Sequence, residues 1–212
     1  MKKTKNTLAR IVATAAGASA LLIAGVAQAA LQDRDLDGDS VVDAFYDTDL
    51  DITWLRDAKV NGAMDWDNAV AWADGFSIGG YDDWRLPTTL QPDATCGSQY
   101  AGQDYGYNCT GSEMGHLWYV ELGNIAGSMT NAGNFQNLQD SALWSGTKYA
   151  PDPRHAWYFD TIDGNQQWGS GNFFLALPVR PGDVPVVPEP QTYALMLAGL
   201  AALAMVRRRR TR

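Results

Sequence analysis

Carboxylate side chains gather near the start of the chain with a spacing that could bind a cation. Eight acidic residues fall within the 19 residues from Asp33 to Asp51, and Arg34 is the only basic residue among them. Alternate oxygen ligands with a glycine at the sixth position are typical of EF-hand-type calcium loops. Two registers of such a loop fit part of this segment. Together they predict five calcium ligands, which are Asp33, Asp35, Asp37, Asp39 and Asp43.

Neither register matches the full loop. A loop that starts at Asp33 has Gly38 at the sixth position, but its twelfth position is Ala44 rather than a bidentate acid. A loop that starts at Asp35 puts Ser40 where the glycine belongs. Because either ligand set is incomplete, we expect calcium as a weak cofactor with a Kd of ~10⁻⁴–10⁻³ M. The alternative is a solvated acidic leader that binds no ion.

Other chemically active groups are few. The only histidines are His116 and His155, and Glu113 with His116 has the Glu-x-x-His spacing that carboxylate metal sites need twice. The chain shows no nucleophile elbow, no Cys/His zinc spacing and no phosphate loop. We therefore expect a protein that is not an enzyme and takes no organic cofactor.

The charges of the body and of the two ends differ. Nine of the 16 basic residues are terminal, whereas the segment from Ala30 to Val187 holds seven basic and 23 acidic residues, a difference of −16. A body this acidic repels phosphate backbones, so nucleic acids are excluded as partners.

The N-terminus has the pattern of a secretory signal. Basic residues precede an apolar stretch, and Ala27-Gln28-Ala29 forms an A-x-A site, which predicts a signal peptide over residues 1–29 with cleavage after Ala29. Export would place Cys96 and Cys109, the only cysteines, in an oxidising compartment. A disulfide between them is the favoured interpretation, and two free thiols are the alternative.

The C-terminus combines Pro188-Glu189-Pro190, an apolar run over residues 193–206 and four consecutive arginines. Fourteen residues span roughly 21 Å of helix, which is short of a ~30 Å hydrocarbon core and suits a transient stop with arginines held inside. This tail resembles the PEP-CTERM sorting signal over residues 188–212. The resemblance implies a Gram-negative exported protein, inserted transiently in the inner membrane through residues 193–206. An exosortase would cut it near the Pro-Glu-Pro motif, and the product would be released or attached at the cell surface, in the exopolysaccharide or biofilm matrix.

The body between the two signals has an α+β pattern. One helix is predicted from Asp65 or Asp67 onward, with apolar residues at helical spacing up to Phe76, and a second over Met114–Leu122, opened by a capping box at Thr110–Glu113. Asp163-Gly164 has the sequence of a tight hairpin turn, and residues 87–111 form a long polar loop that the disulfide would staple. Short strands are predicted over residues 44–46, 52–55, 142–144, 156–161 and 173–179.

The body is also rich in aromatic residues, with eight tryptophans and nine tyrosines in the chain. Aromatic faces stack on sugar rings, but core packing explains most of these side chains, including Trp54, Trp66, Trp144 and Trp157. We expect one or two of the eight tryptophans to serve a ligand.

Several blocks of the body carry a second resemblance, and they include Trp84-Arg85-Leu86-Pro87-Thr88 and Leu143-Trp144-Ser145-Gly146-Thr147. In their order they resemble the Lcl C-terminal domain family over residues 44–183. That leaves residues 30–43 as the acidic leader and residues 184–187 as a linker. The residues that form this signature are Trp54, Trp84, Arg85, Leu86, Pro87, Trp144 and Arg180.

This second resemblance implies a C-type-lectin-like fold, with two helices on a small twisted antiparallel sheet whose terminal strands pair. Some family members bind sulfated polysaccharide, but a body with a charge of −16 is a poor receptor for polyanions. We therefore expect a non-catalytic carbohydrate-binding or structural module for a neutral, cationic or calcium-bridged extracellular polysaccharide. The alternative is a thiol- or metal-dependent oxidoreductase, because oxidases with a related fold in the sulfatase-modifying-factor group use a reactive cysteine pair, which only Cys96 and Cys109 could supply.

Overall fold

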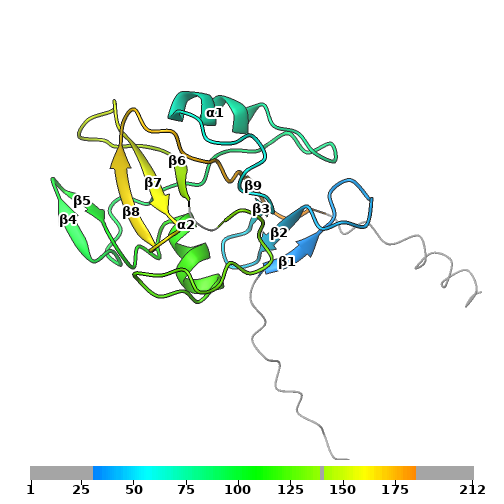
Figure 1. The fold of residues 1–212 in the computed structure, drawn as a ribbon, viewed down its shortest axis with the longest axis horizontal. Helices are drawn as coiled ribbons and strands as arrows, with labels where there is room; N and C mark the ends of the chain where they lie inside the picture. Colours follow the sequence, from blue (N-terminus) through cyan, green and yellow to red (C-terminus); the bar gives the residue numbers. More distant parts are fainter. Residues whose placement is uncertain (1–30, 139–140, 185–212) are drawn as a thin grey trace, which may run out of the picture.

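A computed structural model describes residues 31–138 and 141–184 of the chain (Figure 1). The predicted signal peptide, linker and sorting signal lie outside these residues, apart from Val184 at the start of the linker. The described part is a mixed α+β structure, as the sequence predicts, with two helices and three antiparallel sheets. No helix in this part of the chain is long and apolar enough to cross a membrane. The predicted membrane segment, residues 193–206, is outside it.

The first sheet brings both ends of the described chain together. Its strands lie in the order β1-β2-β3-β9, and β9, the last strand of the described residues, therefore pairs with β3 at one edge. Arg34 in β1 donates to the Asp183 carboxylate at 2.6 Å, and this hydrogen bond lowers the pKa of Asp183. The bounds of the strands are Leu31–Arg34 for β1, Ala44–Asp47 for β2, Ile52–Leu55 for β3 and Val179–Pro181 for β9.

The other two sheets form the opposite side of the domain (Figure 1). One is a three-stranded meander in the order β6-β7-β8, and the other is a two-stranded hairpin. A backbone bridge between Gly106 and Gln166 joins the hairpin to the meander. The bounds are Ala142–Lys148 for β6, Ala156–Asp160 for β7, Asn165–Gly169 for β8, Ser98–Tyr100 for β4 and Gln103–Tyr105 for β5.

The sequence predicted a single small sheet with a strand over residues 173–179, and the structure corrects both points. Phe174 bridges Met64, Leu175 bridges Leu143, and Val179 alone enters a regular strand. The segment therefore changes partner every few residues as it crosses from one sheet to another. The backbone of this segment forms isolated bridges to several partners, and none of them extends into a ladder that would join the sheets into one.

The first helix, α1 (Trp66–Asp74), follows the sequence prediction closely. The Asp65 carboxylate accepts from the backbone N–H of Asn68 at 2.9 Å, which satisfies one of the free donors at the helix start. Ala69 and Ala73 are fully buried against the meander side of the core, and Gly75 ends the helix. The helical spacing of the apolar residues thus predicted which face of α1 packs against the core.

The second helix differs from the prediction in type. Only Glu113–Gly115 is α-helical (α2), and the chain continues as a π-helix over His116–Glu121 (η1). The predicted capping box does not form, because Ser112 is the residue before the helix and its side chain makes no cap bond. The carboxylate of Glu113 instead accepts from the guanidinium of Arg85 at 2.8 and 2.7 Å.

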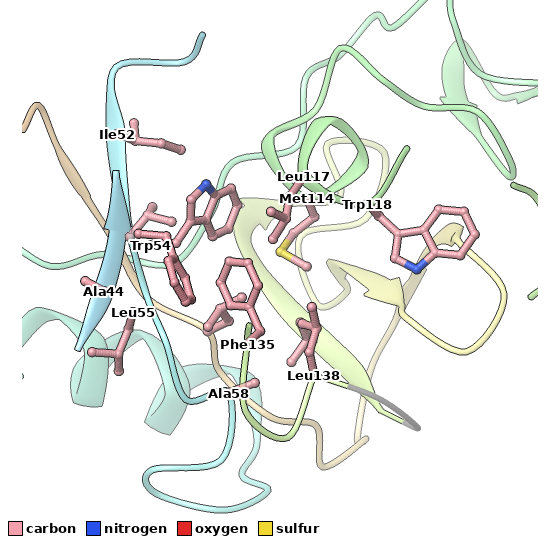
Figure 2. Close-up of a cluster of buried hydrophobic side chains, with 14 of the residues drawn as sticks. Ala44, Ile52, Trp54, Leu55, Ala58, Met114, Leu117, Trp118, Phe135 and Leu138 are labelled. Atoms are coloured by element: carbon pink, nitrogen blue, oxygen red, sulfur yellow. The ribbon is translucent and has the colours of Figure 1, made fainter. Parts of the chain in front are cut away.

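A large apolar core lies between the first sheet and the α2–η1 helix (Figure 2). Trp54 of β3 is fully buried there, beside Phe135 and side chains of the helix such as Leu117. A smaller cluster packs α1 against β6 around Trp144, whose indole N–H donates to the Met64 carbonyl at 2.8 Å. Together the two clusters fix the positions of the loops that carry the candidate sites.

The residues of the predicted family signature are structural. Trp54, Trp84, Leu86, Pro87 and Trp144 are buried in the core or against it. The two arginines of the signature make paired ionic contacts: Arg85 with Glu113, and Arg180 with both oxygens of Asp83 at 2.6 and 3.0 Å. The hydrogen bond from Arg180 lowers the pKa of Asp83. Packing and ion pairs therefore account for these signature residues.

Candidate functional site

The acidic leader forms a turn that brings three of its carboxylates together. One oxygen from each of Asp35, Asp37 and Asp39 lies within 4.8 Å of the others. Side-chain oxygens also organise the turn, because Asp35 accepts from the backbone N–H groups of Gly38 at 2.7 Å and Ser40 at 2.9 Å. Burial raises the pKa of Asp35, but the backbone donors around it outweigh that effect, and its pKa lies below the ordinary value. Asp35 is therefore held as a carboxylate that faces solvent.

The three convergent carboxylates belong to the second of the two predicted loop registers, which starts at Asp35. Both candidate sixth positions, Gly38 and Ser40, have positive φ (83° and 69°), the conformation for which calcium loops select glycine, so the backbone alone does not separate the registers. Asp33 does not join the cluster, because it lies in β1 opposite Phe45 and lines a separate cavity. The sequence alone could not separate the registers, since both contain three alternate acids.

Asp43, the remaining predicted ligand, faces back into the turn. Its Oδ2 accepts from the Leu36 backbone N–H at 2.8 Å, which ties the end of the turn to its beginning. Burial, and then repulsion from Asp37, Asp39 and Asp35, raises the pKa of Asp43. The leader thus concentrates negative charge that a bound cation would relieve.

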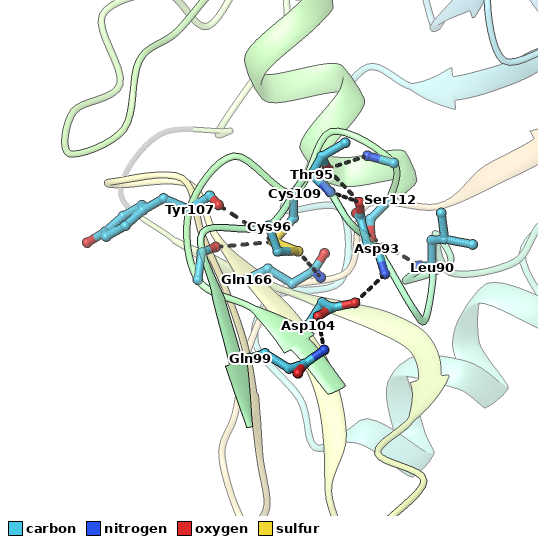
Figure 3. Close-up of a disulfide and its surroundings, with 12 residues drawn as sticks. Leu90, Asp93, Thr95, Cys96, Gln99, Asp104, Tyr107, Cys109, Ser112 and Gln166 are labelled. Atoms are coloured by element: carbon cyan, nitrogen blue, oxygen red, sulfur yellow. Dashed lines mark hydrogen bonds between the residues drawn. A yellow bond between two sulfur atoms is a disulfide. The ribbon is translucent and has the colours of Figure 1, made fainter. Parts of the chain in front are cut away.

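The predicted disulfide between Cys96 and Cys109 is present (Figure 3). Cys109 is fully buried, and the surrounding segment is held by buried polar contacts rather than by apolar packing. The Asp104 carboxylate accepts from the Asp93 backbone N–H and from the Gln99 amide, both at 2.9 Å. The bridge therefore closes a polar segment whose hairpin end is exposed.

That exposed end carries a set of aromatic rings, which we call the hairpin platform: Tyr100, Tyr105 and Trp168. Tyr100 of β4 and Trp168 of β8 stack nearly parallel, with an interplanar angle of 11° and ring centroids 6.1 Å apart. Tyr105 of β5 meets Trp168 edge-on at 5.1 Å. Tyr100 is 62% exposed, and the other two rings are partly exposed.

Buried rings support the platform from beneath. Tyr149 stacks on Trp168 at 4.5 Å with an angle of 4°, and Trp157 meets Trp168 edge-on at 5.3 Å. Both supporting rings are buried. Trp168 is therefore held in a fixed orientation, and Tyr100 lies on it as an aromatic surface open to solvent.

The surroundings of the platform are polar but carry little charge. Residues 94–111 contain a single charged side chain, Asp104, which is buried. The exposed neighbours of Tyr100 in the hairpin include Ser98 and Gln99, whose side chains can donate and accept hydrogen bonds. The hairpin segment itself thus exposes no charged side chain.

Five of the other seven tryptophans are buried. The three placed in strands, Trp54, Trp144 and Trp157, are buried as predicted. Trp66 is half-buried on α1, where its indole N–H donates to the Ser145 carbonyl and Lys148 lies 3.5 Å from the ring centroid. Trp168 was not singled out, because the polar strand β8 that carries it has no apolar alternation.

Comparison with known families agrees with both resemblances. The Lcl C-terminal domain family matches residues 43–180, and the PEP-CTERM protein-sorting motif matches residues 186–210. No curated protein matches the chain. The sorting motif implies export and sorting to the cell surface, with a C-terminal membrane-anchoring segment and processing by an exosortase. The chain therefore belongs to the Lcl C-terminal domain family and carries a PEP-CTERM sorting motif behind that domain.

Proposed function

We propose that this protein is a non-catalytic carbohydrate-binding module of the extracellular matrix, with a C-type-lectin-like fold and a neutral polysaccharide as its ligand. The observation that carries the proposal is the hairpin platform, in which an exposed tyrosine rests on an immobilised tryptophan. Aromatic rings combine a large apolar face with polar edges, which is the combination that a sugar ring presents in return.

The geometry favours binding without a large ordering cost. Because Trp168 stacks on the buried Tyr149 and Tyr100 stacks on Trp168, the platform does not need to rearrange when a sugar stacks on it. The Ser98 side chain, two residues before Tyr100 in the same strand, supplies a hydrogen-bonding group beside the exposed ring. The lack of exposed charge in the hairpin favours a neutral glycan, and the acidic body disfavours sulfated chains.

A glycan array tests this proposal. The protein is recovered after export from its host and applied to neutral, cationic, uronate and sulfated polysaccharides, with and without calcium. We expect retention by one or more neutral polysaccharides and none by sulfated chains. A folded protein that binds no glycan, or that binds only sulfated ones, would contradict the proposal.

We also propose that the acidic leader binds calcium and stiffens the start of the domain. The convergence of Asp35, Asp37 and Asp39 and the left-handed Ser40 support this role. Calcium should raise the melting temperature by mass action, most visibly near and above ~1 mM. Asp35→Asn with Asp37→Asn should abolish the rise, as measured by thermal denaturation.

A charge-matched variant controls the calcium experiment. Asp74→Asn with Asp82→Asn removes two exposed carboxylates outside the leader and should keep the calcium-dependent rise in melting temperature. If magnesium stabilises the protein as much as calcium does, and the leader variant still responds, the leader is only a solvated acidic run.

Processing of the tail gives a further prediction. Since an exosortase cuts near Pro188-Glu189-Pro190, the mature protein should lack the segment from Tyr193 to Arg212, which intact-mass measurement would show. Neutral residues in place of Arg207–Arg210 should impair processing, because the arginines keep the tail end on the cytoplasmic side. Secreted protein that retains the arginine cluster would contradict this prediction.

A further inference from the structure

A second group of potential ligands lies inside the domain, away from both the acidic leader turn and the hairpin platform. One oxygen of Asp47, one ring nitrogen of His116 and one oxygen of Glu121 all lie within 4.8 Å of one another. His116 Nε2 and Glu121 Oε1 are 3.3 Å apart. The Asp47 and Glu121 side chains are almost completely buried. Neither the sequence pattern nor the proposed function accounts for this cluster.

The π-helix is what brings two of these residues together. His116 and Glu121 are the first and last residues of η1, five positions apart. In an α-helix, residues five apart point about 140° away from each other. The wider turn of a π-helix, marked here by the Leu122 N–H donating to the Leu117 carbonyl at 2.9 Å, places them on one face. Short π-helical turns are rare and occur frequently at functional sites.

The third residue is held in place by its own hydrogen bonds. Asp47 ends β2, and its Oδ1 accepts from the backbone N–H groups of Asp49 and Leu50 at 3.0 Å each. Within the described part of the chain its Oδ2 accepts only from the indole N–H of Trp54, at 3.3 Å, and so keeps a lone pair for another partner. Hydrogen bonds of this kind orient carboxylates that bind metal ions.

The cluster has an imbalance of charge. Two buried carboxylates lie close together, and among residues 31–138 and 141–184 neither has a lysine or arginine as an ion-pair partner. His116 offsets one of the two negative charges only when it is protonated, and burying the other carboxylate without compensation is costly. A divalent cation at the centre of the three ligand atoms would supply the compensation.

We propose that Asp47, His116 and Glu121 bind a divalent first-row transition-metal ion such as zinc. An imidazole nitrogen combined with carboxylate oxygens suits such an ion better than calcium, which takes oxygen ligands. Bonds of 2.0–2.2 Å to a tetrahedral ion put ligand atoms about 3.4 Å apart. The 3.3 Å between His116 and Glu121 fits this value, and the rest requires only small side-chain movements.

A cavity of about 180 Å³ adjoins one of the three ligands, Glu121, and offers the ion a route from solvent. Asp33, Asn131 and Asn134 line the same cavity and add polar groups that can hold water near the ion. Three protein ligands with a fourth position toward solvent are typical of zinc sites that exchange a ligand.

The test uses the protein recovered after export, without a polyhistidine tag and stripped with a chelator. Zinc binding is measured by calorimetry, and cobalt is added as a spectroscopic probe of the coordination shell. We expect one zinc per chain and a zinc-dependent rise in melting temperature. His116→Gln and Glu121→Gln should each weaken zinc binding by roughly tenfold or more and remove the cobalt absorption bands of the parent.

Two control variants locate the bound ion. His155→Gln removes the other histidine, and Asp37→Asn with Asp39→Asn removes carboxylates of the leader; both should bind zinc like the parent. Equal zinc affinity in the His116 variant and the parent would overturn the proposal. Loss of zinc binding in either control instead of in His116→Gln and Glu121→Gln would overturn it too. Were His116→Gln to misfold, Glu121→Gln and the cobalt spectrum would still decide the question.

Discussion

Alanine in place of Trp144 is expected to lower the free energy of unfolding by about 3–5 kcal/mol, the usual cost of deleting a buried tryptophan. The side chain is fully buried in β6 and packs against the rings of Tyr158 and Phe174. Its indole N–H also satisfies the Met64 carbonyl, so the variant leaves a cavity and loses a buried hydrogen bond. Against a typical total stability of ~5–15 kcal/mol, this loss is large.

Urea denaturation measures the effect of the Trp144 substitution, and two further variants calibrate it. Trp144→Phe keeps an aromatic ring but drops the bond to Met64, and should cost about 1–3 kcal/mol. Phe173→Ala changes a side chain that is 67% exposed and should stay within about 0.5 kcal/mol of the parent. If Trp144→Ala lowered the free energy of unfolding by less than Trp144→Phe does, Trp144 would not hold α1 to the meander.

Removal of the disulfide should have the second-largest effect. Cys96→Ser with Cys109→Ser is expected to cost roughly 3 kcal/mol, the chain-entropy value for a loop near this length. The enclosed segment is polar, so little apolar burial would keep it ordered once the bridge is gone. Thermal denaturation gives the loss of stability, and limited proteolysis should show new cuts within residues 97–108.

The same cysteines decide between the binding module and the oxidoreductase alternative. A structural bridge resists mild reductants, and the burial of Cys109 limits access to its sulfur. An active-site pair would instead cycle and present a thiol of lowered pKa. Fast alkylation of the native protein at neutral pH without prior reduction would therefore contradict the structural role and favour the oxidoreductase.

The features that the sequence predicted well are those set by local rules or by composition. Asp65 caps α1 because a short acceptor precedes an apolar helical face, which is visible in the sequence. Ile52–Leu55 is a strand rich in β-branched and large apolar side chains, and Asp163-Gly164 lies in the turn between β7 and β8. The disulfide followed from export and from a count of two cysteines.

The helix after the disulfide shows where local rules fail. Thr110–Glu113 has the letters of a capping box, but Arg85, 28 residues earlier, takes the Glu113 carboxylate. The Glu-x-x-His spacing assumed an α-helix and paired Glu113 with His116, whereas the π-helix pairs His116 with Glu121. Nothing in one sequence shows the change of helical pitch, because it depends on tertiary packing.

The hairpin platform could not be predicted for a different reason. Its rings come from β4, β5 and β8, which are short polar strands without apolar alternation. The β4–β5 turn uses Ala101 and Gly102, both with positive φ, and alanine rarely indicates such a turn. The sequence predicted that one or two tryptophans would serve a ligand, but only the paired strands show that Trp168 lies against an exposed tyrosine.

The proposal that the hairpin platform binds a neutral matrix polysaccharide is tested most directly by comparing two matched variants. Tyr100→Ala and Phe173→Ala each remove one exposed aromatic ring, 62% and 67% exposed, and only the first belongs to the platform. We expect isothermal titration with the polysaccharide retained on the array to show at least roughly tenfold weaker binding for Tyr100→Ala, about 1.4 kcal/mol. Phe173→Ala should bind like the parent, with both variants folded by thermal denaturation. Equal affinities of Tyr100→Ala and the parent would contradict the account.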